Sequence, residues 1–226
     1  QNNLLARLLM KRFIFLFIFL FSCDAKDNLI IKGNIYGLKK SKLYLYDIEK
    51  NTFVDSTFVK NEAFELKSNI DEPFELKIIL GSKNSENSYS FFTEPTEVLF
   101  SSSKDKFEFN GKIENSVLAK EQEMIDVQLI KFEEIKLNLL SQQIKFSANN
   151  EKAKYDSINK EREKIEIKKT LFIVNYCLNH PEKHTSAFIA YKYRGIINKQ
   201  YLKKIYNNFS EKIKSSYYSK KLESNF

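Results

Sequence analysis

The sequence predicts an α+β protein, in which an N-terminal antiparallel β sandwich is followed by a helical hairpin or bundle. Three observations predict this order. Apolar and polar residues alternate with a period of two from Asn28 to Ile113, which is typical of strands with one buried face. After Ser116 the apolar residues recur every seven positions, which is typical of long paired helices. The charge changes at the same place, because residues 24–115 carry 13 lysines against 16 carboxylates, whereas residues 116–226 carry 21 basic and 13 acidic residues.

The β block consists of short alternating runs separated by polar turns. Their spacing, roughly 8–12 residues, and their many Tyr and Phe residues favour strands of a sandwich or barrel. The apolar positions expected to face the core are Leu29, Ile31 and Ile35; Leu43 and Leu45; Phe64 and Leu66; Phe74, Leu76, Ile78 and Leu80; Val98 and Phe100; and Phe107 and Phe109.

The helical block begins at Ser116, a residue type that caps the first turn of a helix. The spacing predicts one helix of about 30 residues, a turn at 147–150, and a second long helix that Pro181 ends. The two helices can pair antiparallel through their apolar stripes. Three shorter helices are expected to follow, over 186–194, 199–208 and 210–222.

The stretch from Met10 to Cys23 has the layout of a secretory signal peptide with a lipid-attachment cysteine. Two basic residues precede nine apolar residues, Phe13 to Phe21, and then a serine and Cys23. This apolar run is shorter than the roughly 20 residues of a membrane-spanning helix. We therefore expect a signal peptide at 10–22, a lipid on Cys23, and a non-native upstream segment at 1–9. A short buried helix is the alternative, but the residues that follow Cys23 are polar.

The expected organisation is a β-sandwich domain over 24–115 and a helical domain or linker over 116–226. Glycine (5 residues) and proline (3 residues) are scarce, which argues against a disordered chain. The chain has two cysteines, so lipid on Cys23 would leave Cys177 without a disulfide partner. A free cysteine is most often buried.

Four segments carry a resemblance to a known family. They are IIKGNIYGLKKSKLYLYD (30–47), VDSTFVKNEAFELKSNIDEPFELKI (54–78), FEFNGKIENS (107–116) and LKKIYNNFSEKIKSSYYSKKL (202–222). In this order the chain resembles Bacteroidetes-type lipoproteins with an uncharacterised β-rich domain, usually found N-terminal to a thioredoxin-like domain of the TlpA/ResA kind. The resemblance implies a lipid anchor and a β domain without assigned catalytic residues.

Two features depart from that family. Glu62 stands where the family usually has glycine in a hairpin turn, which affects the expected turn type but not the strands. The sequence also contains no Cys-x-x-Cys, which a thioredoxin-like domain needs for its redox chemistry. The redox activity of the family is therefore not carried over to this chain.

Candidate metal ligands form one cluster, Cys177, His180 and His184, in the pattern C-x2-H-x3-H. A structural zinc site needs four ligands, and Pro181 prevents the two histidines from sharing a helical face. We expect a buried thiol and two loop histidines, with no metal and no cofactor. The adjacent acidic pairs Asp71-Glu72 and Glu133-Glu134 are expected to be solvated, because neighbouring side chains point to different faces.

Two further patterns in the sequence suggest a modification site and a binding surface. Asp55-Ser56-Thr57 is similar to the acceptor pattern of Bacteroidetes O-glycosylation, which makes Ser56 the candidate acceptor. The Tyr- and Lys-rich segments 191–194 and 217–221 have the composition of a nucleic-acid patch, but an exported protein rarely meets nucleic acid. We expect these segments to be solvated basic helix faces, near anionic lipid head groups.

Together these observations predict a non-enzymatic lipoprotein of the cell envelope, lipid-anchored to the outer membrane on its periplasmic or surface face. It would act as a binding or scaffolding module, with other envelope proteins or a glycan as partners and no nucleic acid. The alternative is the accessory N-terminal half of a thiol–disulfide oxidoreductase whose thioredoxin domain is missing or separately encoded. A Cys-x-x-Cys reading frame after the codon for Phe226 would favour that alternative.

Overall fold

The computed structural model describes residues 27–226, and its α+β class confirms the prediction. Eight strands precede six α-helices, and a short 3-10 helix, η2 (Lys104–Lys106), follows β7. The strands are β1 (Leu29–Tyr36), β2 (Lys40–Asp47), β3 (Thr52–Lys60), β4 (Ala63–Ser68), β5 (Phe74–Leu80), β6 (Ser88–Thr93), β7 (Glu97–Ser103) and β8 (Lys112–Glu114). The helices are α2 (Val117–Ala148), α3 (Lys152–Asn179), α4 (His184–Lys192), α5 (Lys199–Asn208), α6 (Glu211–Lys214) and α7 (Tyr217–Glu223).

The strands form a sheet in the order β6-β5-β2-β3-β4-β1-β7-β8, which folds into two halves. The halves are joined where β3 turns into β4, and these two strands share a single register pair, Lys60 with Ala63. The turn between them, Asn61-Glu62, has φ values of 49° and 70°, as a tight hairpin turn requires. Glu62 is thus accommodated where the related family has glycine, and its carboxylate accepts a hydrogen bond of 2.7 Å from the N–H of Gly37.

The purely antiparallel arrangement that we predicted is wrong at one place, because β1 and β7 are parallel, with Ile31 opposite Val98. The alternation of side chains determines which face of a strand is buried, but it does not determine the neighbouring strand. Gly33 lies at this parallel pair, and a side chain there would come within 2.5 Å of the carbonyl oxygen of Phe100. This close approach explains a glycine inside a strand.

The core of the β part lies between the two halves and contains the residues that the period of two placed there. Leu43 and Leu45 of β2 are fully buried, while Tyr44 between them points outward. Fully burying one such aliphatic side chain contributes roughly 1.5–3 kcal/mol to stability. One predicted core position is wrong, since Phe109 is 78% exposed. It lies in the turn after η2, where the strand alternation has ended.

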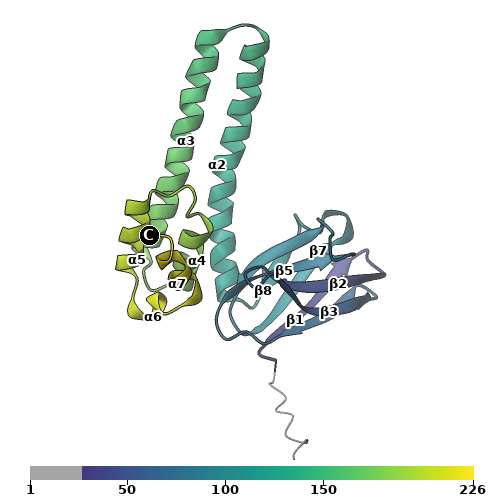
Figure 1. Cartoon of the computed structure of the whole chain (residues 1–226). Helices are drawn as coiled ribbons and strands as arrows, with labels where there is room; N and C mark the ends of the chain where they lie inside the picture. Colours follow the sequence, from purple (N-terminus) through teal and green to yellow (C-terminus); the bar gives the residue numbers. More distant parts are fainter. Residues whose placement is uncertain (1–26) are drawn as a thin grey trace, which may run out of the picture.

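The two long helices form the predicted antiparallel hairpin. Ser116 caps α2, and its side-chain oxygen accepts a hydrogen bond from the N–H of Ala119. Phe132 and Phe172 pack across the hairpin with their ring centroids 6.0 Å apart. Figure 1 shows the hairpin extending well beyond the other helices, which gather beside its base, and beyond the sheet. Within residues 27–226, no helix combines the length and the apolar composition needed to cross a membrane.

The last predicted helix, 210–222, is interrupted and forms α6 and α7. Ser215 and Ser216 lie at the break, and their hydroxyls donate hydrogen bonds of 2.7 Å to the carbonyls of Lys212 and Ile213. Serine side chains compete in this way with the helical backbone for its carbonyl groups. The break redirects the chain so that Tyr217 and Tyr218 reach the sheet.

Candidate functional site at the sheet–helix junction

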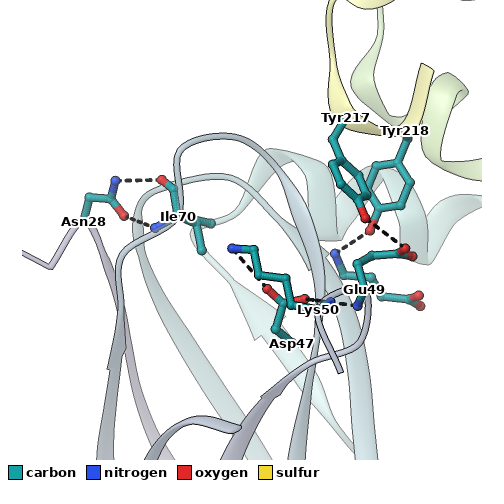
Figure 2. A network of polar contacts seen from close by, with 8 residues as sticks. Asn28, Asp47, Glu49, Lys50, Ile70, Tyr217 and Tyr218 are labelled. Carbon is teal, nitrogen blue, oxygen red and sulfur yellow. Dashed lines mark hydrogen bonds and ion pairs between the residues drawn. The ribbon is translucent and has the colours of Figure 1, made fainter. Parts of the chain in front are cut away.

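A network of polar contacts lies where the C-terminal helices meet the sheet. We call it the junction and define it by five residues: Glu49, Glu75, Lys192, Tyr217 and Tyr218. The hydroxyl of Tyr218 accepts a hydrogen bond of 3.0 Å from the N–H of Glu75, and its ring is 3% exposed. Figure 2 shows both tyrosines reaching from the helices to the loop and strand below them.

Aromatic packing surrounds this hydrogen bond. Phe92 of β6 stacks on Phe188 of α4, with centroids 4.3 Å apart and an angle of 10° between the rings. Tyr218 packs edge-on against both rings, at 5.8 Å and 5.1 Å. Aromatic pairs of this geometry contribute about 0.5–1.5 kcal/mol each beyond the burial of their surface. The cluster therefore joins the helical core to the outer face of β6.

The charged groups of the junction pair with each other. Lys192 of α4 forms an ion pair of 2.6 Å with the largely buried Glu75. Burial raises the pKa of Asp126 on α2, and the charge of Lys192 partly opposes that rise. Burial also raises the pKa of Glu49, with the negative charge of Glu75 as the second cause, while the hydroxyl of Tyr217 donates to Glu49 at 3.4 Å. Burial raises the pKa of Tyr217 to about 12.

A rigid loop presents Glu49 to the helices. The buried Asp47 accepts hydrogen bonds of 3.0 and 2.9 Å from the N–H groups of Glu49 and Lys50. On the neighbouring loop, Asn28 exchanges two hydrogen bonds with the backbone of Ile70, at 2.7 and 2.9 Å (Figure 2). Side chains of Asp and Asn commonly hold turns in this way. The junction thus rests on loops whose own hydrogen bonds are satisfied.

The first turns of helix α2 pack against β6, which is an edge strand of the sheet. The side chain of Gln122 accepts a hydrogen bond of 2.7 Å from the N–H of Phe92 on the edge strand β6. Glu94 accepts from the N–H groups of Val117 and Leu118, at 2.8 and 3.2 Å, in the first turn of α2. An unpaired strand edge would otherwise be open to pairing with another chain. The first turns of α2 therefore protect this edge.

The arrangement fastens the helices to the sheet through the ion pair between Lys192 and Glu75 and the hydrogen bonds of Tyr217 and Tyr218. Sequence reasoning missed the junction, since its partners are as much as 168 residues apart, as in the bond from the hydroxyl of Tyr217 to Glu49. The expectation that 217–221 is a solvated face is wrong for Tyr218 and Ser219, which are buried. Of the two acidic pairs expected to be solvated, Glu72 is half-buried and accepts a hydrogen bond from the N–H of Tyr217, whereas Asp71 is exposed. Glu133 and Glu134 are exposed, as expected, and Glu133 also forms an ion pair with Lys169.

The residues of the candidate metal cluster have separate environments. Cys177 is fully buried, its Sγ lies 3.4 Å from the carbonyl oxygen of Ser186, and burial raises its pKa to about 12. The Nδ1 of His180 lies 2.9 Å from the carbonyl oxygen of Tyr176. Burial lowers the pKa of His184. Among residues 27–226 no group of three or more potential ligands is arranged to hold a metal ion.

Two further sequence predictions concern modification. Ser56 is exposed on β3, next to Asp55, whose carboxylate accepts hydrogen bonds of 2.7 Å from the N–H groups of Ser56 and Lys67. Its glycosylation stays a prediction. Cys23, the signal peptide at 10–22 and the upstream segment at 1–9 lie outside the described residues.

Fold and junction define an α+β protein in which a β sandwich carries a helical arm, joined to it by the contacts of the junction and of the first turns of α2. The model of a protein family described as "Domain of unknown function (DUF4369)" matches residues 29–122. This match covers the eight strands and the first residues of α2, so the β part of the chain is similar to that uncharacterised domain. No curated protein and no solved structure matches the chain.

Proposed function

We propose that the chain is a lipid-anchored protein of the cell envelope that acts as a non-catalytic binding or scaffolding module. The basic start, the apolar run and Ser22 before Cys23 support the anchor. The family match supports a β part of the kind found in the Bacteroidetes-type lipoproteins that the sequence resembles. In this proposal the sandwich is the base, and the hairpin α2–α3 is the arm that meets another envelope protein.

One observation carries the binding role: an unpartnered apolar stripe along α2. Ile130, Leu137 and Ile144 are 54%, 68% and 62% exposed, and they recur every seven residues. The opposite side of α2 already packs on α3, so the stripe is not needed for the hairpin itself. Seven-residue spacing is the spacing with which one helix packs into another. The partner we propose is therefore a helix of another envelope protein with the same spacing.

The anchor is tested by labelling cells with a clickable fatty acid. The wild-type chain should be labelled and a Cys23→Ala variant should not, because stable anchoring needs acyl chains on that cysteine. Equal labelling of the two chains would contradict the lipid anchor.

The binding role is tested with a double variant, Leu137→Glu and Ile144→Glu. The matched control is Asn138→Glu with Ser141→Glu, two exposed uncharged positions of α2 that add the same two negative charges. After mild detergent extraction from membranes, the wild type and the control should migrate as a complex larger than the monomer. The stripe variant should migrate as the monomer with an unchanged far-UV circular dichroism spectrum. A wild-type chain that is extracted as a monomer would refute the proposal.

A further inference from the structure

The outer surface of β2 and β3 carries a cluster of half-buried and exposed side chains, which we call the aromatic–lysine face. It consists of Lys42, Tyr44, Tyr46, Phe53, Phe58 and Lys83. The strand register places Lys42 opposite Phe58, and Tyr46 opposite Phe53. Because side chains alternate along a strand, these residues point away from the core that Leu43 and Leu45 help to form.

The aromatic rings of this face are in contact with one another. The centroid of Phe53 lies 5.6 Å from that of Tyr44 and 5.1 Å from that of Tyr46. Phe58, farther along β3, is 53% exposed and is flanked by two surface hollows of about 510 and 530 Å³. Phe58 thus gives a ligand an apolar surface with room on both sides of it.

Two lysines lie directly over these rings. The Nζ of Lys42 is 5.0 Å from the centroid of Tyr44 and 5.6 Å from that of Phe58. The Nζ of Lys83 is 4.7 Å from the centroid of Phe53. Cation–π attraction holds an ammonium group near such a ring. A molecule that approaches the rings therefore meets these ammonium groups first, and it stacks on a ring face by moving the flexible lysine side chains aside.

Five lysines of this face and of the hollow beside it have no ion-pair partner among the described residues. Lys39, Lys40 and Lys60 line the hollow of about 530 Å³ beside Phe58. Within residues 27–226, neither these three lysines nor the two over the rings form an ion pair. Three carboxylates lie nearby. Asp55 and Glu62 accept hydrogen bonds from backbone N–H groups, and Glu65, which lines the other hollow beside Phe58, pairs with Lys67. The five lysines outnumber these three acids.

We propose that the aromatic–lysine face binds an acidic polysaccharide. The flat apolar side of a pyranose ring stacks on Tyr and Phe side chains, and the carboxylate of a uronic acid pairs with the lysine ammonium groups that the sugar moves from the ring faces. A neutral glycan would use the rings but leave five unpaired lysines unused. This inference deepens the proposed binding function. It rests on the proposed location in the cell envelope, where the protein would encounter acidic polysaccharides.

The experiment measures binding of residues 27–226 to polygalacturonate by isothermal titration calorimetry at low and high salt. Dextran is the neutral probe and poly(dT) is the nucleic-acid probe. Polygalacturonate should bind, with an affinity that falls as salt rises, and it should bind at least about tenfold more tightly than either other polymer. A dextran affinity equal to that of polygalacturonate, or a preference for poly(dT), would overturn the assignment.

Exposed substitutions test the residues without disturbing the fold. Lys42→Gln with Lys83→Gln should weaken polygalacturonate binding about tenfold, and Phe58→Ala should weaken it about fivefold. The control, Lys203→Gln with Lys204→Gln on the exposed side of α5, removes the same charge and should leave the affinity unchanged. Equal affinities of the two double variants would contradict the proposal. The α2 stripe variant should bind the glycan normally, so failure here is separate from failure of the hairpin contact.

Discussion

Tyr218 is the residue through which the junction can be dissected, because its ring and its hydroxyl have separate roles. Tyr218→Phe keeps the ring among Phe92, Phe188 and Tyr191 but removes the oxygen that accepts from the N–H of Glu75. A buried N–H left without an acceptor costs about 1–3 kcal/mol. For a chain of this size, ~2 kcal/mol lowers the melting temperature by about 4–8 °C. Tyr218→Ala also removes the ring, and should cost about 3–5 kcal/mol.

The assay is urea unfolding of residues 27–226, followed by far-UV circular dichroism, together with amide hydrogen exchange. Tyr218→Phe should reduce the free energy of unfolding by ~2 kcal/mol and should accelerate exchange of the Glu75 amide. Tyr201→Phe, at a residue 44% exposed on α5, is the matched control and should change neither quantity. If Tyr218→Phe differs from the wild type by less than about 0.5 kcal/mol, the hydrogen bond does not secure the junction.

Three other predictions follow from the same structure. Burial raises the pKa of Asp126 in the folded protein, so ionisation of this carboxyl destabilises the fold. Asp126→Asn should therefore raise the melting temperature at pH 7. The gain should vanish below about pH 4, where the carboxyl is protonated in the folded and the unfolded states. Cys177 should react with iodoacetamide at pH 7 only after urea unfolding, and no disulfide-reductase activity should depend on it, since burial raises its pKa to about 12. A fragment of residues 27–115 should give a strand-type spectrum but lower stability, because Phe92 would lose its helical cover.

The sequence predicts structure accurately where the pattern of apolar and polar residues depends only on neighbouring positions in the chain. Leu43 and Leu45 were placed in the core by a period of two, and the helix over 199–208 has the predicted bounds. The pairing of β1 with β7 could not be predicted in this way, because alternation is the same for every neighbour. The break at Ser215-Ser216 could not be predicted either, because the apolar residues on both sides of it keep the spacing of one continuous helix.

The candidate sites were harder to predict than the fold for a related reason. The bond between Glu75 and Tyr218 joins residues 143 positions apart, and neither residue belongs to a motif. The cysteine and histidine spacing at 177–184 was visible in the sequence, yet the structure gives each of those residues a separate backbone contact or environment. The outward residues of β2 and β3 became a face only once the register of the strands was known.

The protected edge at β6 has a mechanical consequence. Helix α2, with 32 residues, is about 48 Å long, and its first turns are bonded to Phe92 and Glu94 at the end of that strand. The hairpin is thus attached to the sheet at one end, at β6. The C-terminal helices, which lie beside that end (Figure 1), pack on the same strand through the contact of Phe188 with Phe92. If the hairpin tilted by only ~5° about its attachment at β6, the turn between α2 and α3 would move by about 4 Å, which is most of the rise of one helical turn.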